Sequence, residues 1–132
     1  MAFLSLTTKQ SGDHAEAIAK QFLERQKLQV VEQNYRCRQG EIDLVMKHKH
    51  CLVFVEVRCR KNSRFGSAIE TIDTRKQRKL IRAALHFLSK NKGFANYSCR
   101  FDVIGIEYDQ AQQSRLAQDN CHIEWIQDAF QQ

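Results

Sequence analysis

The feature that most constrains this chain is the run Cys51–Arg58, in which every residue before Glu56 is apolar. Its valines and its phenylalanine favour extended backbone, because β-branched and aromatic side chains pack well on a pleated surface. An unbroken apolar run of this length is typical of a strand that is buried on both faces. The chain therefore has to build a sheet with this strand at its centre and cover both sides of it.

The flanking segments predict an α/β fold. Residues 41–46 alternate in polarity as a strand does, and the polar run Lys47–His50 predicts a hairpin turn into the central strand. The element order predicts a mixed central β-sheet flanked by helices, with one helix on each face or both on one. The remaining elements are expected as helices over 11–25 and 74–91, and as strands over 28–35, 97–107 and 121–126.

The length of 132 residues predicts a single domain over residues 1–132. Residues 1–10 are expected to be a loose leader, residues 108–120 an irregular loop, and residues 128–130 a terminal turn. The cysteines are odd in number and form no CxxC pair, which argues against a disulfide framework and a zinc site. With no apolar run long enough to span a membrane, we expect a cytoplasmic protein.

Positive charge is concentrated in one part of the sequence. The segment from Arg58 to Lys92 holds eleven basic side chains against Glu70 and Asp73, a net charge of +9, while the whole chain carries +6. Such a segment favours binding to a polyanion, nucleic acid first among them, over a merely solvated helix face.

Two carboxylates, Asp43 and Glu56, lie inside apolar runs. Buried carboxylates are costly unless they are paired or bind a cation. If the hairpin turns at Lys49 and His50, the numbers of opposed residues sum to 99, so Asp43 faces Glu56 at about 4.5–5.5 Å. A divalent cation such as Mg²⁺ would convert their repulsion into coordination.

Arg58 follows Glu56 by two residues and is therefore on the same face of the strand. A Glu-x-Arg pair is most often a structural ion pair. The additional acid at Asp43, the apolar surroundings and the adjacent basic segment favour a functional site here.

Four motifs carry a resemblance to a known family: Gly12-x-x-x-Glu16, the run 40–45, the run 52–58, and the run 100–104. Together they resemble the YraN family of uncharacterised bacterial proteins over about residues 11–107. That family is similar to archaeal Holliday-junction resolvases of the PD-(D/E)xK superfamily, which implies a restriction-endonuclease-like sandwich. Asp102, in the last motif, either neighbours the site or caps a loop.

The resemblance implies a metal-dependent phosphodiesterase site. Asp43 and Glu56 would hold Mg²⁺, or Mn²⁺, with the carbonyl of Val57 as a further ligand. Glu16 matches the acidic helical residue of the resolvases and would lean toward the same cation. The metal would activate a water and offset charge on the scissile phosphate.

The sequence departs from the superfamily pattern at Arg58, where a lysine is expected. Lysine can lose its proton when its pKa is lowered, whereas arginine stays protonated, so Arg58 would only orient a water or stabilise the phosphate. Lys76 is a candidate substitute, because the helical line Lys76, Leu80, Ala84 points toward the sheet.

The leading hypothesis is a Mg²⁺-dependent nuclease-like protein acting on branched or structured DNA. One alternative is a catalytically inactive DNA- or RNA-binding module of the same fold, and another is a basic adaptor for an acidic protein or RNA. A homodimer stays open, since resolvases are dimers but no apolar stripe demands one. The residues expected to hold phosphates are Arg60, Lys61, Arg64, Arg75, Lys79 and Arg82.

Overall fold

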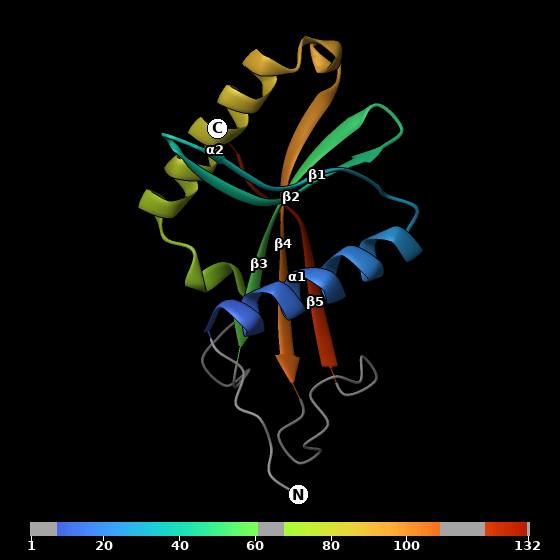
Figure 1. The fold of residues 1–132 in the computed structure, drawn as a ribbon, viewed down its shortest axis with the longest axis vertical. Coiled ribbons are helices and arrows are strands. Elements are labelled where there is room, and N and C mark those ends of the chain that lie inside the picture. Colours follow the sequence, from blue (N-terminus) through green and yellow to red (C-terminus); the bar gives the residue numbers. More distant parts are fainter. Residues whose placement is uncertain (1–7, 61–67, 109–120, 132) are drawn as a thin grey trace, which may run out of the picture.

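The computed structural model describes residues 8–60, 68–108 and 121–131. A five-stranded sheet in the order β1-β2-β3-β4-β5 forms its centre, and the chain has the expected α/β fold (Figure 1). The helical elements are α1 (Thr8–Arg25), η2 (Ala68–Thr71), α2 (Thr74–Lys90) and η3 (Lys92–Phe94). The strands are β1 (Gln29–Cys37), β2 (Gly40–His48), β3 (Cys51–Arg60), β4 (Ser98–Tyr108) and β5 (Cys121–Phe130).

The apolar run forms the central strand, as predicted. β3 pairs antiparallel with β2 on one side and parallel with β4 on the other. Residues 52–55 are almost fully buried, because both faces of β3 are covered. The parallel pairing requires a crossover connection, and η2, α2 and η3 lie in the segment that makes it.

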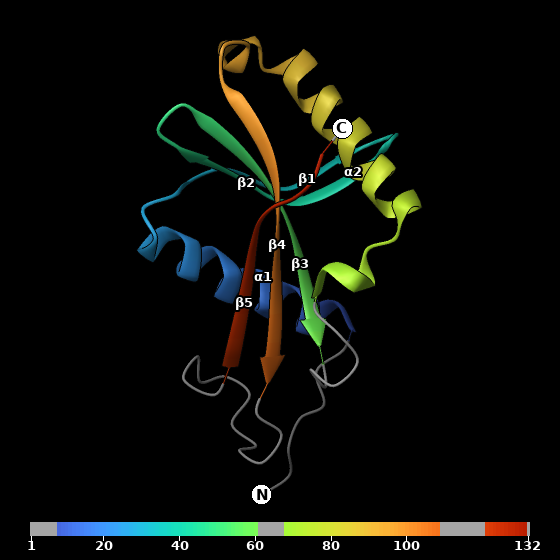
Figure 2. The ribbon, with the colours of Figure 1, turned by 180° about the vertical axis from the view of Figure 1, so that it is seen from behind.

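One helix covers each face of the sheet, which decides between the two arrangements left open by the sequence. Helix α1 crosses in front of the strands in Figure 1 and behind them in Figure 2. Its buried stripe packs into one apolar cluster with Leu44, Val53 and Val55. The buried stripe of α2 packs into a separate cluster with Ile42, Leu52 and Phe54.

Three predicted boundaries were wrong. Helix α1 begins at Thr8, so residues 8–10 are not a leader; no glycine or proline interrupts 8–11, and the helix continues through them. Strand β4 includes Tyr108, while the rest of the predicted loop, 109–120, and the leader residues 1–7 lie outside the described residues.

The predicted turn over 128–130 is instead the end of β5. Asp128 adopts a left-handed conformation with φ of 51°, which bends the strand without ending it. Phe130 then stacks on Phe101, with ring centroids 4.9 Å apart. The apolar contact holds the last residues of β5 on the sheet.

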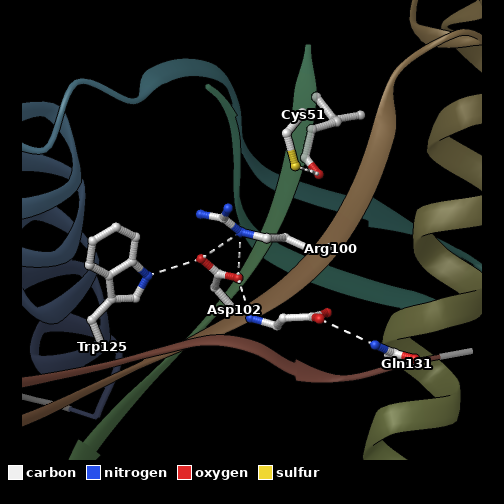
Figure 3. Close-up of polar contacts among 7 residues, drawn as sticks. Cys51, Arg100, Asp102, Trp125 and Gln131 are labelled. Atoms are coloured by element: carbon white, nitrogen blue, oxygen red, sulfur yellow. Dashed lines mark hydrogen bonds and ion pairs between the residues drawn. The ribbon is translucent and has the colours of Figure 1, made fainter. Parts of the chain in front are cut away.

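Asp102 fastens β5 to β4 and is a structural residue. Its side chain is fully buried and accepts hydrogen bonds from Trp125 Nε1 at 2.9 Å and from the Asp128 amide at 2.9 Å. Arg100 Nε donates to it at 3.0 Å and supplies the countercharge (Figure 3). These bonds form where the β4–β5 register shifts, between Phe101 and Val103, so Asp102 compensates for an interrupted ladder.

Candidate active site

The hairpin of β2 and β3 has the predicted register. Its paired residues run from His48 and Cys51 to Leu44 and Val55, and the numbers in each pair sum to 99. The next residues in line are Asp43 and Glu56, where the ladder ends. There the Val57 amide donates to Asp43 Oδ2 at 2.8 Å instead of to the backbone of β2. The structure thus brings Asp43, Glu56 and Val57 together at the point where the two strands separate.

Strand β2 is irregular at Asp43. Ile42 and Val45 both belong to the cluster under α2, whereas Leu44 between them belongs to the cluster under α1. Regular alternation would put Ile42 and Leu44 on the same face, so the strand must twist at this point. Asp43 consequently lies between the side of the sheet that α1 covers and the side that α2 covers, within reach of side chains from both.

Glu16 approaches Asp43 from α1. Burial, followed by the negative charge of Asp43 and a hydrogen bond with it, raises the pKa of Glu16 to about 7. Asn34 has the opposite effect on this pKa. With its amide oriented as a donor, its nitrogen lies 3.1 and 3.0 Å from the two Glu16 oxygens.

Glu56 is 5% exposed and is the more deeply buried acid of the site. Burial, then the charge of Asp43, raises the pKa of Glu56 to about 8, and a hydrogen bond with Asp43 contributes. Two cations oppose this increase. Lys76 Nζ lies 3.5 Å and Arg58 Nη2 lies 3.3 Å from Glu56 Oε2.

Lys76 contacts Glu56 from the first turn of α2; its helical line predicted only that the side chain points toward the sheet. The carboxylate of Asp73 caps this helix by accepting from the Lys76 amide at 2.8 Å. The cap fixes where α2 begins and therefore which residue of its first turn faces Glu56. A lysine from α2 thus lies where the hairpin itself offers only an arginine.

Arg58 forms the expected ion pair with Glu56, but the pair does not use all of its donors. Its Nε atom is buried and has no hydrogen-bond partner in the described part of the chain. A buried N–H without an acceptor is unfavourable, so the arrangement suits a ligand that carries an acceptor oxygen.

The donor set suits a hard divalent cation. Glu16, Asp43 and Glu56 come from three elements, and their mutual repulsion is a reason for the raised pKa values of two of them. Among the described residues, no three His, Cys, Asp or Glu side chains already stand at metal-ligand spacing. A cation would therefore have to draw these carboxylates closer and displace their protons.

Comparison with known proteins identifies the family. The model of the uncharacterised protein family UPF0102 matches residues 15–106. A UPF0102 protein of Pseudomonas syringae pv. syringae is 48% identical over 124 residues, covering 94% of this chain and 95% of that protein. One from Nitrosococcus oceani is 44% identical over 94% of both chains, and one from Alcanivorax borkumensis 47% identical over 92% of both. The chain belongs to the UPF0102 family.

The UPF0102 match spans every acidic residue of the site and Lys76, and it ends before β5. It also contains Asn34, which the sequence reasoning did not identify. An asparagine within a predicted strand was the available signal, because asparagine tolerates the left-handed conformation that Asn34 adopts, with φ of 52°. Across the described residues, no helix is long and apolar enough to cross a membrane.

The residues predicted to hold phosphates are only partly described. Arg75, Lys79 and Arg82 are exposed along α2, the helix that also carries Lys76. Lys61, Arg64 and the side chain of Arg60 lie outside what the structure describes. The first residue of β2 packs closely on α2, since a Cβ on Gly40 would lie 3.2 Å from the Lys79 carbonyl oxygen.

Proposed function

We propose that this UPF0102 protein is a metal-dependent nuclease-like protein that binds and cleaves structured or branched DNA. The single observation that carries the proposal is the meeting of Asp43 and Glu56 at the end of the β2–β3 ladder, with Glu16 and Lys76 beside them. An apolar sheet has no structural need for three carboxyl groups at one point. Paired carboxylates that can hold a divalent cation, with a lysine beside them, are one set of groups that supports phosphodiester hydrolysis.

The carboxylates of Asp43, Glu56 and Glu16 would hold Mg²⁺ or Mn²⁺. When bound, the metal would supply Lewis acidity toward a phosphate oxygen and a water. The chain contributes the positioning. Asp43 is fixed by the Val57 amide, and Glu16 is fixed by the Asn34 amide.

Lys76 and Arg58 would have different roles in the reaction. Lys76 Nζ would orient a water or exchange a proton, since a lysine, unlike an arginine, is able to give up its proton. Arg58 stays protonated, and its unpartnered Nε would donate to a phosphate oxygen.

The basic face of α2 supports DNA as the substrate class. Its exposed arginines and lysines lie on the helix that carries Lys76, so a backbone bound along α2 would run toward the acidic groups. Phosphate contacts of this kind report backbone shape more than sequence. Branched DNA in particular is implied by the similarity of the family to resolvases.

The test is Mg²⁺-dependent cleavage of a four-way junction by the wild type and by Asp43→Asn, which removes one charge and keeps the shape. We expect Asp43→Asn to lower the rate by about 100-fold or more, since the carboxylate holds the metal. Glu41→Gln is the matched control, because Glu41 is an exposed acid on the same strand and its ion partner in the described part of the chain is Arg36, at the surface. Cleavage retained by Asp43→Asn would contradict the proposal.

A second candidate is a DNA- or RNA-binding module of the same fold without catalysis. The observation that favours it is Arg58, which occupies the position of the expected lysine and is paired with Glu56. Titration calorimetry with Mn²⁺ distinguishes the two functions. If the protein is a nuclease, the wild type gives a heat of Mn²⁺ binding and Glu56→Gln gives none. If it is a binding module without catalysis, neither the wild type nor Glu56→Gln gives a heat of binding.

A further inference from the structure

A pocket of about 640 Å³ lies at the other end of the β2–β3 hairpin from the acidic site. We call it the hairpin pocket. It is lined by the turn of the hairpin, by the connection from α1 into the start of β1, and by the residue before β4. The lining residues that matter here are Lys27, Lys47, His48, Lys49, His50 and Tyr97.

The hairpin pocket is cationic and carries no acid in its lining. Lys27, Lys47 and Lys49 make no ion pair with any residue that the structure describes. Unpaired cations gathered around a concave surface raise the local positive potential and concentrate anions there. This charge is separate from the basic segment 58–92 that the sequence identified.

Two of these lysines hold left-handed backbone conformations, with φ of 75° at Lys27 and 56° at Lys49. Glycine or asparagine would adopt such conformations with less strain, because a Cβ with a long side chain crowds the backbone there. Both conformations belong to turns, one that ends α1 and one that joins β2 to β3, and these turns hold the two lysines in the lining of one pocket.

Tyr97 forms a wall of the hairpin pocket. The Lys47 ammonium lies 5.6 Å from the centre of its ring, and the His50 ring packs against it at 5.5 Å. These contacts orient Lys47 and His50 within the pocket. The site is therefore partly organised before any ligand binds.

We infer that the hairpin pocket binds a backbone phosphate of the same DNA molecule on which the acidic site acts, an inference that rests on the proposed function. Lys47 and Asp43 are four residues apart on β2, which at about 3.4 Å per residue is about 14 Å. Each strand of a duplex has one phosphate for about every 3.4 Å of helix axis, so a duplex whose axis runs along β2 meets the pocket about four base pairs from the reacting phosphate.

The test is the salt dependence of DNA binding by the double variant Lys27→Asn/Lys49→Asn, measured without metal on a duplex of about 24 base pairs. Asparagine removes the charge and tolerates the left-handed conformation, so the fold is spared. We expect the slope of log K against log salt to fall by about two, and the affinity near 150 mM salt to drop about 10-fold or more. Lys27→Arg/Lys49→Arg should restore both values.

Arg36→Gln/Arg38→Gln is the matched control, since it removes two exposed charges that lie neither in the pocket lining nor in the basic segment 58–92. An equal loss in this control, or an unchanged slope in the pocket variant, overturns the inference. Polyglutamate is the test for an acidic protein as the ligand. If it binds the wild type and its affinity falls by the same factor in the pocket variant, the pocket is a site for an acidic protein, and the inference is overturned.

The inference and the proposed function fail in different measurements. If Asp43→Asn retains cleavage and the salt slope of DNA binding is smaller in the pocket variant, the proposed active site is wrong and the pocket inference is supported. If cleavage depends on Asp43 but the slope is unchanged in the pocket variant, only the pocket is wrong. Absence of duplex binding by the wild type at any salt concentration overturns the pocket inference, whereas the proposed function is decided by cleavage of the four-way junction.

Discussion

At the scale of a single residue, Glu56 interacts with another acid and with both cations of the candidate site. Its carboxyl group is buried in the most apolar strand and faces another acid, a combination that a protein rarely keeps without compensation. Lys76 and Arg58 provide part of that compensation through contacts at 3.5 and 3.3 Å. Burial and Asp43 nevertheless have the larger effect, because the pKa of Glu56 stays above its ordinary value.

The raised pKa values predict how stability depends on pH in the metal-free protein. Glu16 and Glu56 titrate near 7 and 8 when folded and near 4.5 in the reference state, so the folded protein binds protons more tightly. Their contribution to stability is fully present below about pH 4.5 and is lost as pH rises through 7 and 8.

Urea unfolding in the presence of a chelator measures this effect. We expect the midpoint to fall between about pH 5 and about pH 8, and Glu56→Gln to flatten the fall, since it has no proton to lose. Glu41→Gln should keep the wild-type profile. If the urea midpoint of Glu56→Gln falls with pH as steeply as that of the wild type, other groups cause the dependence.

Lys76→Arg separates charge from proton transfer. Arginine keeps the positive charge beside Glu56 but does not lose its proton, so metal and DNA binding should remain while the cleavage rate falls by about 100-fold. Single-turnover cleavage with saturating protein measures the rate, and anisotropy measures the binding. A rate unchanged in Lys76→Arg would exclude a proton-transfer role and leave an electrostatic one.

At the scale of elements, β4 and β5 depend on one buried carboxylate. Asp102 accepts from Trp125, Arg100 and the Asp128 amide where the ladder between the two strands is interrupted. Asp102→Ala leaves the Trp125 and Asp128 donors without their acceptor and removes the countercharge of Arg100. We expect a loss of about 3 kcal/mol in the free energy of unfolding.

Urea unfolding followed by Trp125 fluorescence measures this loss, because Trp125 is the only tryptophan. Asp128→Asn is the control, since it keeps the backbone amide that donates to Asp102 and tolerates the left-handed conformation of this residue. Residual cleavage activity of the folded Asp102→Ala protein should be close to wild type. A large loss of activity in protein that is still folded would mean that Asp102 contributes to the site.

At the scale of the whole molecule, the acidic site joins both layers of the sandwich. Glu16 comes from the helix on one face and Lys76 from the helix on the other, and Asp43 lies between them. A cation held here should therefore stabilise the complete fold. At a Mn²⁺ concentration about 100-fold above its Kd, the gain is about 2.7 kcal/mol.

Thermal unfolding with and without Mn²⁺ tests this linkage. We expect the wild type to show a higher Tm with Mn²⁺, by more at about pH 8 than at about pH 6, because the metal competes with protons for Glu16 and Glu56. Asp43→Asn should lose the increase. An equal increase in Asp43→Asn would place the bound ion elsewhere.

The sequence by itself determined the central strand, the hairpin register and the two helices. These follow from short-range rules: an apolar run demands cover on both faces, and a two-residue turn fixes which residues oppose one another. It also placed Lys76 on the inner face of its helix, since helical spacing alone sets that direction.

Only the tertiary structure decided that one helix lies on each face, that Glu16, Asn34 and Lys76 converge on Asp43, and that Asp102 is structural. The contributing residues are far apart in the chain, so no local periodicity relates them. The break in alternation at Asp43 lies where β2 leaves its ladder with β3 but stays paired with β1. Contacts between distant segments depend on the packing of whole elements, and that packing exists only once the chain has folded.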